Sequence, residues 1–345
     1  MAGLIDIPII ARGQVIMPGD DAVEYSGRSG ARFRTPDPHR HVHDLILGNP
    51  ALLADLMDMP TASIIELLVE LGKKLRLEDN SYLQDSFALA LEAGGLSEPV
   101  LRGVYDALPT LFDGDELTAT VENTIGARFL DEWVPTPDVS SHCRVRAIGT
   151  RQLHITAGNV PVVAAMTIIR GALAKSDVLI KSPSNDPLTA NAIARTLIDM
   201  APDHPVTRHV AVGYWKGGDE LMDSQIVRTS RIDKIVAWGG MASVRNIQKF
   251  LTPGIDLTAF NPKYSISVIG REALDSEDAM DEAATGIAVV SGFFNQTACA
   301  NTRVVYVECG ADEDSLDRLV ALSEKVAEAF KSLTEILSTP AETPN

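Results

Sequence analysis

One cysteine in this sequence has neighbours that suit chemistry better than a hydrophobic core. Cys299 lies in a run of small and polar residues within SGFFNQTACANTRVVYVECG, residues 291–310. Free cysteines are often simply buried, and Cys309, in the apolar run that follows, fits that description. An accessible thiolate, by contrast, is a strong nucleophile. Cys299 is therefore a candidate nucleophile, with inert burial as the alternative.

Two more polar residues of interest come at the ends of predicted strands. Asn159 follows a glycine in ITAGNVP, and a carboxamide N–H₂ in a cleft could stabilise an oxyanion. On local grounds the better interpretation is an asparagine that caps the next helix, with Pro161 near its first turn. Lys181 ends DVLIK, where a cation could reach a ribose or a phosphate. Taken alone, Lys181 is better interpreted as a solvated lysine.

A pair of glycines, Gly239 and Gly240, follows another predicted strand in IVAWGGMAS. The free N–H groups and the dipole of a helix N-terminus attract anions, so a phosphate could bind here. A simple tight turn explains the two glycines equally well. No G-x-G-x-x-G pattern follows the first strand of the region.

The histidines do not form a convincing metal site. His39, His41 and His43 alternate in HRHVH, and a strand would place all three on one face. No cluster of cysteines or carboxylates completes a ligand set, so a polar loop is favoured and no metal is expected.

The elements that must position these residues follow from the pattern after about residue 150. RQLHITAG, DVLIKSP, TRHVAVGYW and IDKIVAWGG are predicted strands, and the segments between them are predicted helices. Such alternation predicts βαβ units and an α/β fold with a doubly wound, Rossmann-like parallel sheet covered on both faces. Sheets of this kind bind nucleotides at the carboxyl ends of their strands, where Lys181 and the two glycines stand.

Helical periodicity also fills the segment from about Asn49 to Leu111. Helix starts are predicted at Asn49-Pro50 and at Thr61, where a side-chain oxygen before the first turn can cap its free backbone N–H groups. A second set of elements follows the sheet: the predicted strands YSISVIG and NTRVVYVE, a helix before Cys299, and an amphipathic helix from about Asp312 to Leu337.

Four regions are predicted along the chain. Residues 1–135 form an N-terminal helical region that packs on the cofactor domain, and residues 136–258 form that Rossmann-like domain. Residues 259–337 begin a second, apparently truncated catalytic α/β domain that carries Cys299. Residues 338–345 are predicted to be a disordered tail.

Composition narrows the functional classes. A chain of 345 residues suggests two domains, and a net charge of −17 disfavours nucleic acid as a partner. Three cysteines do not suggest a disulfide framework, so a reducing, cytoplasmic compartment is expected. The sequence contains neither a signal-peptide pattern nor an apolar run long enough to span a membrane.

Five segments in order carry a family resemblance: ITAGNVP, VLIKSPSNDPLTANAIA, IVAWGG, NPKYSISVI and FFNQTACANTR. Together they resemble the aldehyde dehydrogenase superfamily, and more closely the LuxC-type acyl-CoA reductases. The resemblance covers about residues 10–310. It implies an aldehyde-dehydrogenase-like fold and reduction of a fatty acyl thioester to the aldehyde.

The resemblance also assigns roles to individual residues. Cys299 matches the catalytic nucleophile, and Asn159 matches the asparagine of the oxyanion hole. Lys181 matches the lysine at the adenosine ribose, and Gly239 and Gly240 match the turn over the cofactor pyrophosphate.

Two departures from the family pattern refine the expected reaction. NAD-specific aldehyde dehydrogenases commonly carry a glutamate where this chain has Ser184, so a 2′-phosphate would not be repelled and NADPH is the expected cofactor. Alignment on Lys263 places Ala259 where aldehyde-oxidising members have the glutamate that activates water. The expected reaction is therefore reduction rather than hydrolysis of the acyl-enzyme.

The expected acyl donor is acyl-CoA or an acylated partner protein, and a homo-oligomer or hetero-complex is expected for the full-length form. Only 46 residues follow Cys299 in the sequence. A nucleotide-binding or subunit-interaction protein of the same fold without turnover therefore remains the alternative, with an ordinary aldehyde dehydrogenase third.

Overall fold

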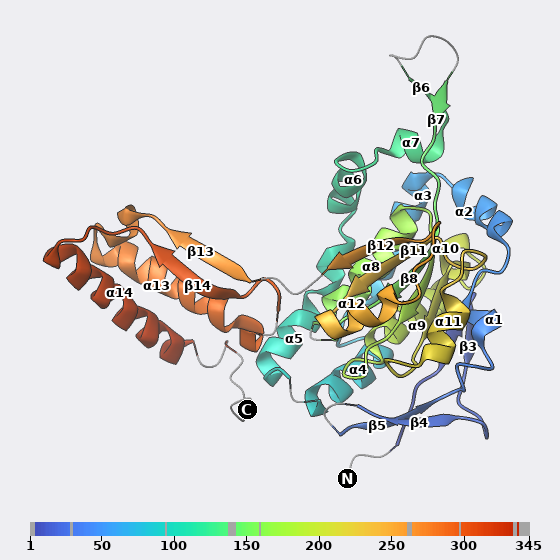
Figure 1. The fold of residues 1–345 in the computed structure, drawn as a ribbon, viewed down its shortest axis with the longest axis horizontal. Coiled ribbons are helices and arrows are strands. Elements are labelled where there is room, and N and C mark those ends of the chain that lie inside the picture. The colour runs from blue at the N-terminus through green and yellow to red at the C-terminus, as the bar shows by residue number, and fades with distance from the viewer. Residues whose placement is uncertain are drawn as a thin grey trace. The chain divides into compact units, whose positions relative to one another are not determined.

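The structure is a computed structural model that describes residues 4–27, 30–93, 95–136, 143–158, 160–260, 264–296, 298–333 and 337. The chain divides into two compact units (Figure 1). The first contains residues 1–93 and 104–261, and the second contains residues 94–103 and 262–345. The four-region division predicted from the sequence remains a prediction.

A seven-stranded sheet forms the centre of the first unit, with the strand order β12-β11-β8-β9-β10-β2-β3. Its parallel strands are β8 (Arg151–Ile155), β9 (Asp177–Lys181), β10 (Val210–Gly213), β11 (Lys234–Trp238) and β12 (Asp256–Phe260). β2 (Ile9–Ala11) pairs antiparallel with β10, and β3 (Gln14–Ile16) pairs antiparallel with β2. The predicted doubly wound parallel sheet is confirmed, with an antiparallel hairpin added at one edge.

Helices cover both faces of this sheet (Figure 1). The core on one face combines apolar strand residues with residues of α1 (Val42–Leu45), α11 (Glu220–Ile226) and α12 (Met241–Gln248). α8 (Val162–Leu173) and α9 (Thr189–Met200) pack on the sheet from the other face. In β9 every residue before Lys181 is buried, as a strand covered on both faces requires.

Further helices pack outside α8 and α9. They are α3 (Thr61–Lys74), α4 (Ser81–Glu92), α6 (Gly114–Glu122) and the 3-10 segment Leu108–Phe112. The unit also contains three shorter helices, α2 (Ala54–Met57), α7 (Ala127–Asp131) and α10 (Pro205–Arg208). A 3-10 segment, Pro50–Leu53, starts as predicted, because the Asn49 side chain accepts a hydrogen bond from the Ala51 N–H. α5 spans Glu98–Asp106.

The predicted start of α3 at Thr61 is confirmed, but the predicted cap is wrong. The N-cap position is Pro60, and the Thr61 hydroxyl instead donates to Asp131 at 2.6 Å. A distant carboxylate, which no local pattern reveals, therefore binds the first residue of the helix.

Two small sheets complete the first unit. β1 (Ile5–Asp6) pairs parallel with β5 (Arg32–Thr35), which pairs antiparallel with β4 (Val23–Ser26). β6 (Val134–Pro135) and β7 (Arg144–Val145) form a short antiparallel pair.

The second unit is a two-layer α/β arrangement. β13 (Ser265–Ile269) and β14 (Thr302–Val307) form a parallel pair, and α13 (Glu277–Gly292) and α14 (Glu313–Ser332) pack against each other, with α13 also against β14. A 3-10 segment, Arg271–Leu274, precedes α13. The sequence predicted all four of these main elements in this order.

Candidate active site

The carboxyl edge of the large sheet brings together four of the predicted site residues. Lys181 is the last residue of β9, and Ser184 lies half-buried in the loop after it. Gly239 follows β11, and Gly240 is the N-cap residue of α12. β8 separates the two strands, with Ile155 paired to both Lys181 and Ala237, so these strand ends lie level. Asn159 lies outside the described residues.

Lys181 lies against two aromatic rings that follow β10. Its Nζ is 5.2 Å from the ring centroid of Trp215 and 5.8 Å from that of Tyr214, within the range of cation–π attraction. Within the described ranges its ammonium makes no hydrogen bond or ion pair. Burial lowers the pKa of Lys181 to about 8, although the nearby carboxylates of Asp223 and Asp219 act in the opposite direction. A cation held in this way is available to a ligand.

Asp223 ties the helices beside Lys181 together. Its Oδ1 accepts from the Trp215 indole N–H at 2.9 Å, and its Oδ2 accepts from the Asn246 amide, also at 2.9 Å. Burial raises the pKa of Asp223, while the hydrogen bond from Trp215 and the charge of Lys181 lower it. The sequence analysis missed Trp215 and Asp223. The only signal for them was that the third parallel strand also ends at this edge, with GYW.

His39 of the histidine cluster contacts this neighbourhood. Its Nε2 lies 2.9 Å from Asp219 Oδ2, and Asp219 also caps α11 by accepting from the Met222 N–H. His41 precedes the helix α1 and His43 lies within it, so the three histidines do not share a strand face. Among the described residues no group of three potential metal ligands comes together.

The turn at Gly239 and Gly240 has room for a ligand. A Cβ built on Gly240 would have no protein atom within 4 Å, and one on Gly239 would make ordinary contact with Ser243 at 3.6 Å. The packing of the protein therefore does not require glycine here. The free N–H groups of α12 start at this turn, with no side chain capping them.

Two buried polar atoms near the same edge lack partners. The hydroxyl of Ser182 and the indole N–H of Trp238 are buried and make no hydrogen bond to any described residue. The Trp238 ring is stacked on Phe260 with 3.9 Å between centroids. Buried polar groups usually find partners, and a bound polar molecule could supply them here. Together with the free cation and the open glycine turn, these atoms fit a dinucleotide.

In the second unit, Cys299 is exposed on a turn between α13 and β14. Its carbonyl oxygen accepts a hydrogen bond from the Ser265 hydroxyl at 2.6 Å, which joins the turn to the start of β13. Exposure of the thiol excludes inert burial. It leaves Cys299 able to meet a substrate.

The buried side chain of Asn301 holds the Cys299 turn in place through three hydrogen bonds. Its side chain, in a residue only 4% exposed, accepts from the Ala298 N–H and donates to the carbonyls of Val290 and Phe293. These bonds connect the turn to the last part of α13. The sequence analysis did not single out Asn301, because nothing in ACANTR separates a buried carboxamide from an exposed one.

The residues before the turn have an unusual backbone. Phe294, Asn295 and Gln296 have φ values of 53°, 50° and 54°, in the left-handed region that residues other than glycine rarely adopt. Each costs of order 1–2 kcal/mol. Strain of this kind is found at functional sites that the surrounding structure holds in place.

The remaining cysteines lie in different settings. Cys143 is exposed beside β7, and Cys309 is half-buried and packs against the core between α13 and α14. All three cysteines are free. In the described part of the chain no helix has the length and apolar character needed to cross a membrane.

The sequence of the chain matches the family model "Acyl-CoA reductase (LuxC)" over residues 56–343. The chain belongs to the LuxC acyl-CoA reductase family. Curated members with similar sequences are named long-chain acyl-protein thioester reductases. The one from Vibrio harveyi is 29% identical over 305 residues, which are 87% of this chain and 60% of the relative. The one from Photobacterium leiognathi is 34% identical over 253 residues, which are 70% of this chain and 49% of the relative.

The chain thus spans about half the length of the curated relatives that it matches. Solved structures with a similar fold are aldehyde dehydrogenases. Lactaldehyde dehydrogenase from Escherichia coli has a TM-score of 0.67 at 13% identity, over 95% of this chain and 64% of that one. NADP-dependent glyceraldehyde-3-phosphate dehydrogenase from Bacillus halodurans C-125 has a TM-score of 0.70 at 16% identity, over 95% and 65%. The aldehyde-dehydrogenase-like fold expected from the sequence is confirmed.

Proposed function

We propose that the protein reduces a fatty acyl thioester to the aldehyde with NADPH, through an acyl intermediate on Cys299. The observation that carries the proposal is the exposed thiol of Cys299 on a turn held by the buried Asn301. Membership in the LuxC family supports the same reaction class. The names of the relatives add that long-chain acyl groups bound to protein are the substrates of those enzymes.

The carboxyl edge of the large sheet would hold the cofactor. Lys181 would contact the adenosine ribose, and Gly239 and Gly240 would lie over the pyrophosphate at the N-terminus of α12. Ser184 places no carboxylate where a 2′-phosphate would come, which favours NADPH over NADH. When bound, NADPH supplies the hydride for the reduction.

Cys299 would carry the acyl group. Its thiolate attacks the carbonyl carbon of the acyl thioester, and the C–S bond to the donor breaks, so the donor leaves as a thiolate. One thioester replaces another, and the exchange is nearly isoenergetic. Asn159, together with the backbone N–H of Cys299, would stabilise the oxyanion of the tetrahedral intermediate. After reduction of the acyl carbon, the thiohemiacetal on Cys299 loses the thiolate and releases the aldehyde.

Ala259 would keep water from competing with this reduction. It is half-buried in β12, and its methyl group cannot take a proton from water. Without a general base, the acyl group on Cys299 is hydrolysed slowly and remains available for reduction. This distinguishes the proposed reaction from that of an ordinary aldehyde dehydrogenase.

The test is an absorbance assay of NADPH oxidation at 340 nm. Long-chain acyl-CoA and an acylated carrier protein are the two acyl donors. Wild type is expected to oxidise NADPH and to form aldehyde, and Cys299→Ala is expected to do neither. Cys143→Ala, which removes another exposed thiol, is the matched control and should retain activity. Full activity of Cys299→Ala would refute the proposal.

A second candidate function is nucleotide binding and subunit interaction without turnover. It is favoured by one face of the β13–β14 sheet, where four apolar side chains are exposed. They are Ile266 (55% exposed), Val268 (73%), Val304 (46%) and Tyr306 (56%). In the strand register Ile266 pairs with Val304 and Val268 pairs with Tyr306, so these side chains form one apolar surface. Saturable NADPH binding with no oxidation in the presence of any acyl donor would favour this function.

A further inference from the structure

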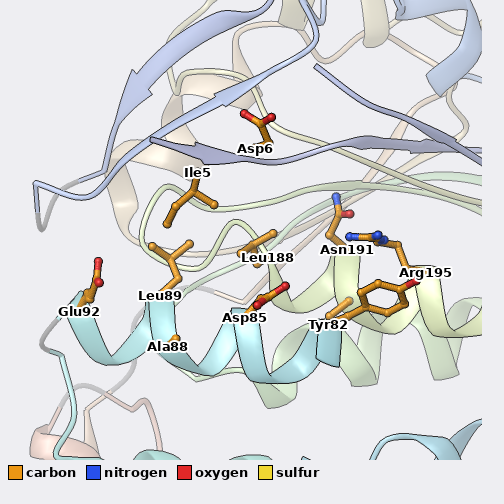
Figure 2. Close-up of a pocket in the computed structure, with 11 residues that line it drawn as sticks. Ile5, Asp6, Tyr82, Asp85, Ala88, Leu89, Glu92, Leu188, Asn191 and Arg195 are labelled. Atoms are coloured by element: carbon orange, nitrogen blue, oxygen red, sulfur yellow. The ribbon is translucent and has the colours of Figure 1, made fainter. Parts of the chain in front are cut away.

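A cavity of about 380 Å³ lies in the first unit between α4, α9 and β1 (Figure 2). Its volume falls within the usual range for small-molecule sites. None of Lys181, Ser184, Gly239 or Gly240 lines it. Its lining combines apolar residues with charged and amide side chains, and the proposed reaction uses none of them.

A buried carboxamide at the cavity has an oxygen with no partner. Asn191 is only 1% exposed, and its Nδ2 donates to the Pro8 carbonyl at 2.7 Å. This bond fixes the side chain, yet its Oδ1 is buried and accepts no hydrogen bond from any residue that the structure describes. A buried acceptor without a donor is costly, so a donor from a bound molecule would stabilise it.

Arg195 offers an anion site beside Asn191. Its guanidinium carbon lies 3.8 Å from the ring centroid of Tyr82, so the ring holds the planar group in one orientation. The Nε–H of Arg195 is buried and has no acceptor among the described residues. No carboxylate in the described part of the chain forms an ion pair with it. A guanidinium held in this way suits a carboxylate that accepts two parallel hydrogen bonds.

Unpaired carboxylates line the cavity further along α4. Asp85 and Glu92 form no ion pair with any described residue, whereas Asp6 is bound by Arg34. Glu92 comes ten residues after Tyr82, which is about 15 Å along a helix at 1.5 Å per residue. Figure 2 shows Arg195 and Asn191 at one end, Glu92 at the other, and Asp85 between them.

Apolar side chains connect the two ends. Ile5, Leu89 and Leu188 lie between the Arg195 end and Glu92 (Figure 2). The cavity therefore has a cationic end with a free amide oxygen, an apolar middle and an acidic region. One guanidinium and two unpaired carboxylates leave a single net negative charge, which a ligand with one net positive charge would neutralise.

We propose that this cavity binds a basic α-amino acid in an extended conformation. The α-carboxylate is bound by the Nε–H and a terminal N–H of Arg195, and the α-ammonium donates to Asn191 Oδ1. The aliphatic part of the side chain lies along Leu188 and Ile5, and the terminal ammonium is bound by Asp85 and Glu92.

Isothermal titration calorimetry of the whole protein with lysine and three analogues of similar length tests each contact separately. ε-Aminocaproate lacks the α-amine, norleucine lacks the terminal ammonium, and cadaverine lacks the carboxylate. Lysine is expected to bind, and each analogue to bind at least about tenfold more weakly, which corresponds to one lost charge-assisted interaction of about 1.4 kcal/mol. No heat of binding with lysine up to about 10 mM, or equal binding of lysine and all three analogues, would overturn the proposal.

Variants locate the binding site. Arg195→Met is expected to lower lysine affinity at least about tenfold and to leave cadaverine binding unchanged. The matched control is Asp199→Asn, an exposed change on the same helix outside the cavity lining. Lysine binding that survives Arg195→Met would overturn the proposal. If Arg195→Met does not fold, the analogue series on the wild type decides.

Discussion

At the scale of single residues, Cys299 owes its proposed role to its surroundings rather than to its type. Three cysteines are free, but Cys309 packs against a core, and Cys143 is exposed beside the short β6–β7 pair, where its carbonyl accepts from Thr136. Cys299 combines exposure with a turn fixed by Ser265 and Asn301. A nucleophile needs both properties, because substrate must reach it and its position must be held.

Removal of the Asn301 carboxamide should therefore loosen the Cys299 turn. Asn301→Ala removes the side-chain donor to the carbonyls of Val290 and Phe293, at a cost of about 1–3 kcal/mol in the free energy of unfolding. Acylation of Cys299 should slow as well. Urea unfolding and acylation rates measure the two effects, and Asn123→Ala, at an exposed helix end, is the control. Unchanged stability and acylation would mean that Asn301 does not hold the turn.

Lys181 should make cofactor affinity depend on pH. Its pKa of about 8 means that the amine is largely charged at pH 7 and largely neutral at pH 9. Attraction to the cofactor is therefore present below pH 8 and is lost as the pH rises through that value. Lys181→Met should weaken NADPH binding about tenfold at pH 7 and flatten this dependence. Fluorescence titration measures both, with Lys216→Met, at an exposed lysine, as the control. If the NADPH affinity of Lys181→Met still depended on pH as in the wild type, the titration of Lys181 would not be the cause.

At the scale of elements, the connections after the parallel strands carry the proposed cofactor site. A substitution in the turn into α12 should change NADPH affinity without a large change in the stability of the fold. Gly240→Ala adds a methyl group where no protein atom lies within 4 Å. The stability should change by less than about 1 kcal/mol, because no contact is strained. NADPH affinity should fall, since the methyl group enters the space that the pyrophosphate would use. Chemical denaturation and NADPH titration distinguish the two effects. Normal affinity in this variant would remove the glycine turn from the proposed cofactor site.

The opposite ends of the strands carry a buried ion network. His209 lies between Asp177 at 2.9 Å and Asp55 at 2.8 Å, and Arg12 and Arg208 pair with the same two carboxylates. Burial alone would lower the pKa of His209, but its hydrogen bonds with Asp177 and Asp55 outweigh burial and raise it. The network joins β9, the residue before β10, and α2.

This raised pKa predicts how stability changes with pH. The charged His209 contributes its full stability below pH 6.5, and the contribution is lost as the pH rises through the raised value of the folded state. His209→Gln removes the charge at every pH, at a cost of about 1–3 kcal/mol at pH 6, because Asp177 and Asp55 keep their arginine partners. The difference in unfolding free energy between wild type and variant should therefore shrink from pH 6 to pH 9. A difference that is constant over this range would contradict the role of the charge.

The sequence predicted the elements well but not the contacts between distant ones. Alternation of apolar strands and helices located β8 to β11 because both faces of a parallel sheet must be apolar. Lys181 and Gly240 were predicted at the carboxyl edge of the sheet, and the structure places both there, while their roles stay predictions. Asp223 and Asn301 were missed, since their roles depend on partners in other elements. The Thr61 cap was wrong for the same reason, because Asp131 lies 70 residues away.

At the scale of the whole molecule, the chain is acidic, with a net charge of −17, and is built from two compact units. The first contains the proposed cofactor residues and the second contains Cys299. The proposed reaction needs both units in one protein, since the acyl group is carried by one and NADPH would be bound by the other. Acyl transfer to Cys299 is the step that the second unit must perform, and it can be measured without any cofactor.

The most direct test is therefore intact-mass spectrometry of the whole protein after incubation with a long-chain acyl-CoA in the absence of NADPH. The wild-type protein, and the Cys143→Ala and Cys309→Ala variants, should each gain the mass of one acyl group, which hydroxylamine removes because it is a thioester. The Cys299→Ala variant should gain none. An acyl group on Cys299→Ala, or none on the wild type, would contradict the account.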